Sequence, residues 1–143
     1  MSISSSIITN NIGTSLEIEE SNLLLFSTTI SDNTESGAVV VASDSFLSAD
    51  DVIISGNVVA QDFVVYLTNS IISLDNTIVQ NNVAICLISL SNSTGSFSGS
   101  VFLDNFGENL SAQLGTQLYV SEYRPVLLQC TKKLRKTVCK LFL

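Results

Sequence analysis

Basic residues are missing from most of this sequence. There is no histidine, and the six lysine and arginine residues all come at or after Arg124. The 13 acidic residues all come at or before Glu122, so an acidic body is followed by a basic end, and the net charge is −7. An acidic surface repels the phosphate backbone of nucleic acids. The sequence therefore argues against a nucleic-acid partner.

Other absences narrow the class of protein further. Pro125 is the only proline, so no other residue would interrupt a strand ladder before it. Cys86, Cys130 and Cys139 form no Cys-x-x-Cys pair, and without histidine they offer no zinc-site spacing.

No apolar run approaches ~18 residues, which argues against a transmembrane segment. The first residues lack the basic region and apolar core of a signal peptide, so we expect a chain that stays where it is made or belongs to a longer protein.

The composition favours β-structure. Hydrophobic residues make up 45% of the chain and charged residues only 13%, about half the usual ~25%. Valine, isoleucine, threonine and short polar turn residues are abundant, and these residue types favour strands. Apolar and polar residues mostly alternate, whereas the spacing of an amphipathic helix is missing before residue 125. We therefore expect strands rather than a helical bundle.

An asparagine recurs every 22 to 25 residues. It ends five similar segments, IITNN (7–11), TISDN (29–33), IISGN (53–57), IVQNN (78–82) and VFLDN (101–105). In each segment the residue three places before the asparagine is apolar, and the residue directly before it is a turn former. A sixth, degenerate segment, VLLQC (126–130), has Cys130 in the asparagine position. A fixed period of this length is the signature of a repeat architecture.

Two more sets of apolar segments lie between successive asparagines, so each repeat holds three short strands. One set comprises residues 22–26, 45–47, 70–74, 95–99 and 117–120, and the other residues 16–18, 39–41, 63–66, 85–88 and 110–114. Coils stacked at the ~4.8 Å strand spacing would bury aliphatic columns in one narrow core. We predict an all-β, single-stranded parallel β-helix (β-solenoid) of about six coils of 22–25 residues over residues 1–130.

Two motifs resemble a known repeat family. FLDN (102–105) matches the FxxN motif, and SGAV (36–39) is similar to the GGA[ILV] motif, of the repeats in chlamydial polymorphic outer membrane proteins. Isoleucine or valine replaces the aromatic residue in the other coils. The resemblance covers residues 7–130 and implies a right-handed, pectin-lyase-like parallel β-helix with a role in adhesion or surface architecture.

The asparagine column is the clearest candidate site. Asparagine suits a bend because it tolerates the left-handed backbone conformation and its amide can bond the amides above and below it. We interpret the column as a structural ladder, and a binding groove is the alternative. The ladder comprises Asn11, Asn33, Asn57, Asn82 and Asn105.

Acidic residues of two coils are candidates for a calcium site or a catalytic pair. Polysaccharide lyases and hydrolases share the β-helix fold. Lyases need a basic residue, usually beside calcium-binding carboxylates, and hydrolases need two carboxylates ~5–9.5 Å apart. Asp51 and Asp75 each come 18 residues after their asparagine, so we expect them to stack on adjacent coils, with Asp50 beside them. Two solvated turns are the alternative, and because the coils contain no base we predict a protein that is not an enzyme, with calcium as the one cofactor considered.

Two tripeptides fit N-glycosylation, at Asn92 and Asn109, and both fall in predicted polar turns. Use of either acceptor requires a eukaryotic secretory route.

Residues 131–143 differ from the body and form a predicted basic tail or cap. Leu134, Val138 and Leu141 have the spacing of a helical face, which predicts a short amphipathic helix. Such a helix could bind a membrane surface or an acidic partner, or it could cap the last coil. Cys130 and Cys139 are candidates for a bridge. The cations of the tail are Lys132, Lys133, Arg135, Lys136 and Lys140.

We expect a non-catalytic structural or adhesive β-solenoid of a cell-surface or extracellular assembly. It would bind protein partners, and also glycans, through its ladder faces and open ends. No charged or helical cap precedes the first coil, and unpaired strand edges there favour self-association. One alternative is a carbohydrate-binding or calcium-dependent polysaccharide-processing domain. Another is an intracellular scaffold subunit, which the missing signal peptide and the odd number of thiols favour.

Overall fold

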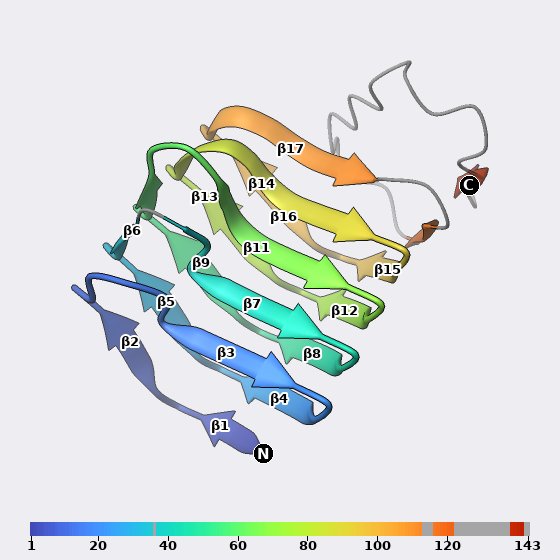
Figure 1. Cartoon of the computed structure of the whole chain (residues 1–143), viewed down its shortest axis with the longest axis horizontal. Coiled ribbons are helices and arrows are strands. Elements are labelled where there is room, and N and C mark those ends of the chain that lie inside the picture. Colours follow the sequence, from blue (N-terminus) through green and yellow to red (C-terminus); the bar gives the residue numbers. More distant parts are fainter. Residues whose placement is uncertain (36, 113–115, 122–137, 142–143) are drawn as a thin grey trace.

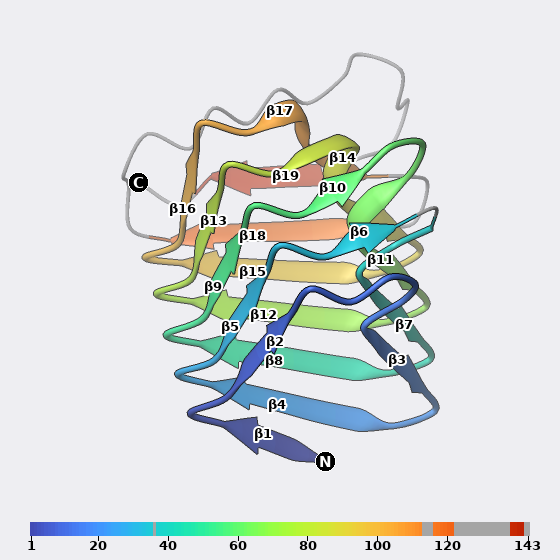
Figure 2. The same ribbon diagram turned by 90° about the vertical axis from the view of Figure 1, so that its left-hand side faces the viewer.

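The chain forms a parallel β-solenoid, as the repeat predicts. The computed structural model describes residues 1–35, 37–112, 116–121 and 138–141, and all the regular structure among them is strand. The strands stack as triangular coils that wind in a right-handed sense from one end to the other (Figure 1 and Figure 2). Five complete coils are described. The predicted sixth coil, with Cys130, lies outside the described residues.

Three parallel sheets, here named A, B and C, form the sides of the triangle (Figure 2). Sheet A contains β1 (Ser2–Ser4), β4 (Asn22–Phe26), β8 (Phe46–Asp50), β12 (Ile71–Asp75), β15 (Thr94–Ser98), β18 (Gln117–Ser121) and β19 (Val138–Leu141). Sheet B contains β2 (Ile7–Thr9), β5 (Thr29–Ser31), β9 (Ile53–Ser55), β13 (Ile78–Gln80) and β16 (Val101–Leu103). Sheet C contains β3 (Leu16–Glu19), β7 (Val40–Ser43), β11 (Phe63–Thr68), β14 (Val83–Ser91), β17 (Phe106–Ala112), and the short β6 (Thr34–Glu35) and β10 (Val58–Val59).

The residues three places before each asparagine lie directly above one another. Ile30 pairs with Ile8 on one side and with Ile54 on the other, and Ile54 pairs in turn with Val79. Ile30, Ile54 and Val79 are all at least 97% buried. The predicted vertical stacking is therefore confirmed, and it fixes the register of sheet B.

The interior is an unbroken aliphatic column with aromatic residues near its far end. Alternate residues of each strand point inward, and fully buried examples are Leu23, Leu47, Ile72 and Leu90. Phe97 packs edge-on against Phe102 in the fifth coil, with ring centroids 6.3 Å apart. One coil could not bury these side chains alone, so stacking supplies most of the stability.

A single residue in the left-handed region turns the chain at each corner of the triangle. The residues between sheets A and B are Ser5, Ser27, Asp51, Asn76 and Gly99; between B and C they are Asn10, Asp32, Gly56, Asn81 and Asp104; between C and the next A they are Glu20, Asp44, Asn69 and Asn92. At the B–C corner this residue comes just before the ladder asparagine. The expectation that the ladder asparagines themselves adopt the left-handed conformation is therefore wrong, because their side chains turn inward instead.

The described part of the basic tail is a strand. Val138–Leu141 forms β19, which pairs in parallel with β18 and extends sheet A. The predicted amphipathic helix is wrong for these residues, because pairing with an open sheet edge satisfies their backbone groups. Lys140 lies in β19, whereas Lys132, Lys133, Arg135 and Lys136 lie outside the described residues.

Candidate functional site

The asparagine ladder runs the length of the B–C corner. From Asn33 onward, each side-chain oxygen accepts two hydrogen bonds from the asparagine of the preceding coil, one from its backbone N–H and one from its Nδ2. Asn57 Oδ1, for example, accepts from the N–H of Asn33 at 3.1 Å and from its Nδ2 at 2.9 Å. The pattern repeats from Asn11 to Asn33, from Asn57 to Asn82 and from Asn82 to Asn105.

The ladder amides are also tied to the strands. Nδ2 of Asn57 donates to the carbonyl of Ile30 at 3.1 Å, and the equivalent bonds of Asn33, Asn82 and Asn105 measure 3.3, 3.0 and 2.8 Å. Asn33 and Asn57 have no exposed surface. With donors and acceptors used and buried, the inner ladder offers nothing to a ligand, which favours the structural interpretation over a groove.

Hydroxyl ladders at the other two corners were missed by the sequence analysis. At the C–A corner, Ser45 Oγ accepts from the backbone N–H of Ser21 at 3.1 Å, and Ser70 and Ser93 continue the series at 3.0 Å. At the A–B corner, Ser100 Oγ accepts from the N–H of Thr77 at 3.1 Å. Their signal is a serine or threonine one place after the left-handed residue at these two corners, with Val52 after Asp51 as the exception, and the asparagine column hid this pattern.

The acidic residues do not stack as expected. Asp75 pairs with Asp50, not with Asp51, which occupies the left-handed corner position and donates its backbone N–H to the carbonyl of Asp75. Counting 18 residues from each asparagine gave the wrong partner because the segment between the asparagine and sheet C differs in length between the two coils. Val65 comes eight places after Asn57, and it pairs with Val40, which comes seven places after Asn33.

Asp50 and Asp75, which lie side by side on β8 and β12, offer few ligands for a metal ion. Ser73 Oγ donates to Asp75 Oδ2 at 3.2 Å. Across the described ranges, no three His, Cys, Asp or Glu side chains gather as a metal site. The calcium site at Asp50, Asp51 and Asp75 stays a prediction, and its ligands would be a pair of carboxylates on neighbouring strands.

The two glycosylation candidates occupy different settings. Asn92 is exposed at the C–A corner, where its Nδ2 donates to Oδ1 of Asn69 at 2.9 Å. Asn109 lies within β17, and its side chain lies outside the described part of the structure. Glycosylation of either residue stays a prediction.

Cys86 is a buried thiol without reactive character. Its Sγ donates to the carbonyl of Ile88 at 3.2 Å, and burial raises the pKa of the thiol to about 12. A thiol held protonated at neutral pH is a poor nucleophile. The candidate bridge between Cys130 and Cys139 involves side chains outside the described residues.

The outward faces of sheets A and B differ in chemistry. The outward positions of sheet B carry no charge and are Ile7, Thr9, Thr29, Ser31, Ile53, Ser55, Ile78, Gln80, Val101 and Leu103. Sheet A presents exposed Phe26 and Tyr119 near its two ends, with Ser48, Ser73, Asp50 and Asp75 between them. The two faces therefore suit different kinds of partner.

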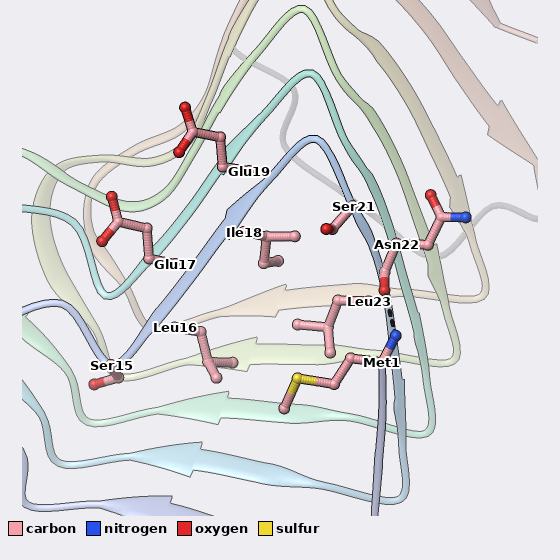
Figure 3. A pocket seen from close by; sticks show the side chains of 9 residues that line it. All are labelled: Met1, Ser15, Leu16, Glu17, Ile18, Glu19, Ser21, Asn22 and Leu23. Carbon is pink, nitrogen blue, oxygen red and sulfur yellow. Dashed lines mark hydrogen bonds between the residues drawn. The ribbon is translucent and has the colours of Figure 1, made fainter.

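The first coil opens onto a hollow of about 690 Å³ at the N-terminal end of the stack. Figure 3 shows Met1, Leu16, Ile18 and Leu23 pointing into the mouth of the core, whereas the glutamates of β3 point to the other side of the strand. The Met1 amine donates to the carbonyl of Asn22 at 2.8 Å. The core is therefore open at this end rather than covered by the described residues.

Comparisons with known proteins give this chain no relative. No family model, no curated protein and no solved structure matched its sequence or fold. Within the described residues, no helix has the length and apolar character needed to span a membrane.

Proposed function

We propose that this protein is a non-catalytic structural or adhesive β-solenoid of a surface or extracellular assembly. The observation that carries the proposal is that the polar side chains at the corners of the coils form hydrogen bonds within the stack and are not free to bind a ligand. Inner corner side chains bond neighbouring coils, while flat sheet faces and strand edges remain outside. Such a stack holds its sheet faces rigidly and presents a broad, flat surface rather than a cleft, and such a surface suits docking of a macromolecule.

We also propose that the repeats are related to those of polymorphic outer membrane proteins, within the pectin-lyase-like β-helices. The support is the position of FLDN (102–105), whose phenylalanine lies in the apolar column and whose asparagine ends the ladder. Because both residues hold structural places, the motif supports fold kinship more strongly than a shared partner.

Localisation of the native protein tests the surface role. Immunogold labelling with an antibody raised against the chain should place it at the cell surface or outside the cell. Label confined to the cell interior would overturn this role and support the alternative of an intracellular scaffold subunit.

A carbohydrate-binding role is the second candidate, and the outward face of sheet A favours it. Phe26 and Tyr119 can stack on sugar rings, while the hydroxyls and carboxylates between them can bond sugar hydroxyls. A glycan array should show binding that Phe26→Ala and Tyr119→Ala abolish. Phe106→Ala should leave binding unchanged, because Phe106 is even more exposed but lies on sheet C. Wild-type chain that binds no glycan would exclude this candidate.

A further inference from the structure

We propose that two copies of this chain associate side by side, with the outward face of sheet B of one copy packed against the same face of the other. This inference rests on the proposed structural role and names a second copy as one of the partners. Three features of the face carry it: its apolar residues, its lack of charge and its extent. All five strands of sheet B lie within residues 7–103, so the contact involves neither end of the sequence.

The outward face of sheet B is regular and partly apolar. Its five strands lie side by side (Figure 2), and their register arranges the outward residues in two straight columns. The first column consists of Ile7, Thr29, Ile53, Ile78 and Val101, and the second of Thr9, Ser31, Ser55, Gln80 and Leu103. The side chains of Ile7, Ile53 and Leu103 are 73, 36 and 46% exposed. Removing this apolar surface from water would stabilise a contact.

Sheet B is also the one side of the triangle whose strands contain no carboxylate. Asp50 and Asp75 lie on the outward face of sheet A, and Glu17 and Glu19 lie on that of sheet C. Two copies that met through sheet A or sheet C would bring carboxylates together, and a basic partner would be attracted to those two sheets instead. An uncharged face selects an uncharged surface as its partner, and sheet B of a second copy is such a surface.

A two-fold axis parallel to the stack makes the two faces complementary. This axis sets each coil opposite the same coil of the second copy, with the strands antiparallel across the contact. The first column then faces the second column of the other copy, so that Ile53 lies against the smaller Ser55. No two carboxylates meet at the borders of the face, because the corner residues that come near each other are Asp32 and Ser27, Asp51 and Gly56, and Asp104 and Gly99.

The extent of the face suits a weak dimer. Five coils at ~4.8 Å and six residues at ~3.3 Å from corner to corner give about 24 by 20 Å, or about 480 Å² on each copy. Two copies would together bury about 1,000 Å², which is near the lower limit of specific interfaces. We therefore expect a dissociation constant between about 10 μM and about 1 mM. The contact uses the same face of both copies, so association stops at the dimer.

Sedimentation equilibrium of the purified 143-residue chain, from about 5 μM to about 2 mM, tests the proposal. We expect the mean mass to rise from the 15.3 kDa monomer toward the dimer and no further. Each copy has a net charge of −7, so raising the salt from about 0.1 M to about 1 M, which shortens the Debye length from about 10 to about 3 Å, should strengthen the association. A monomer throughout, association that salt weakens, or growth beyond the dimer would overturn the proposal.

Two isoleucines at matching strand positions give a controlled pair of variants. Ile53 begins β9 on sheet B, Ile71 begins β12 on sheet A, and both side chains are exposed. Ile53→Ala should raise the dissociation constant about tenfold, because the two-fold axis makes each dimer lose the contact twice. Ile71→Ala removes the same atoms from a face outside the contact and should associate like wild type. Equal dissociation constants for the two variants would overturn the placement of the contact on sheet B.

A second pair of variants introduces charge. Ser55 on sheet B and Ser96 on sheet A are both half-buried, and both lie on strands without a carboxylate. Ser55→Glu places a carboxylate of each copy inside the contact and should abolish the dimer over the same concentrations. Ser96→Glu makes the same change in net charge and should have little effect. Dimers of the Ser55→Glu variant, with its fold verified by circular dichroism, would exclude sheet B from the contact.

The outcomes for the dimer and for the surface role are separate. The sedimentation measurements use purified chain, so they do not depend on where the protein is located. A chain that stays monomeric would overturn the contact through sheet B and leave the surface role standing. An intracellular location would overturn the surface role and leave the dimer standing.

Discussion

Asn57 and Asn11 hold equivalent positions at the same corner, one in the middle of the stack and one at its open end. Asn57 is fully buried, with its oxygen accepting two hydrogen bonds and its Nδ2 donating two. Asn11 is exposed, and its Oδ1 accepts none from the described residues. The local sequences are similar, so the difference shows that neighbouring coils set the energetic role of a repeat residue.

Replacing a ladder asparagine by alanine should show the largest difference in unfolding free energy between the middle of the stack and its first coil. Asn57→Ala leaves the buried N–H of Asn33 without a partner and removes the side-chain bonds of Asn57 to Asn33, Ile30 and Asn82. We expect a loss of about 3–5 kcal/mol in unfolding free energy, since an unpaired buried group costs about 1–3 kcal/mol and each further hydrogen bond contributes about 0.5–1.5 kcal/mol. Asn11→Ala should cost less than about 1 kcal/mol because its surroundings are open to water. Urea unfolding of both variants measures this, and equal losses would remove the distinction.

Substitutions in the aliphatic column should also destabilise the middle of the stack more than the first coil, but by a smaller difference. Ile54→Ala opens a cavity between Ile30 and Val79 and should cost about 2–4 kcal/mol. Ile8→Ala, in the half-buried first coil, should cost roughly half as much because water already reaches the site. Thermal and urea denaturation give both values, and a larger loss at Ile8 would reverse the comparison.

The buried thiol of Cys86, in the middle of the stack, should make the unfolding free energy depend on pH in the alkaline range. Burial raises the pKa of the folded thiol from 9.0 to about 12, so the unfolded chain loses the proton first. The contribution of Cys86 is therefore complete below pH 9 and is lost between pH 9 and pH 12, by up to ~1.4 kcal/mol per pH unit. The difference in unfolding free energy between wild type and Cys86→Ala should therefore be constant below pH 9, and the wild-type value should fall relative to that of Cys86→Ala between pH 9 and pH 12. Parallel pH curves would contradict the assignment.

The smallest effect is expected at a corner of the first coil. Glu20 has a φ of 47°, a conformation that asparagine tolerates better than glutamate, and Asn69 and Asn92 occupy the same corner in later coils. Glu20→Asn should stabilise the fold by about 0.5 kcal/mol. Asn69→Glu, the reverse change, should destabilise it by a similar or larger amount because Asn69 also bonds Asn92. A melting temperature that falls for Glu20→Asn would show that corner conformation is not limiting there.

Residues that recur at regular places could be predicted, and residues that depend on loop length could not. The asparagine spacing located the ladder and the column of Ile30, Ile54 and Val79 correctly. Counting from the same asparagines placed Asp51 beside Asp75, because the longer segment after Asn57 cannot be seen without knowing where the next strand begins. The helical spacing in the tail also misled, since Val138–Leu141 joins an open sheet edge.

The sequence alone determined the repeat, the all-β class and the segregation of charge, because periodic apolar residues and their spacing are properties of the chain itself. Only the tertiary structure decided which residue turns each corner, which hydroxyls form ladders and which polar groups are left at the open end. Those outcomes depend on contacts between coils some two dozen residues apart. The hydrogen-bond partner of a side chain in this fold lies in the neighbouring coil, and its position follows from register rather than from local sequence.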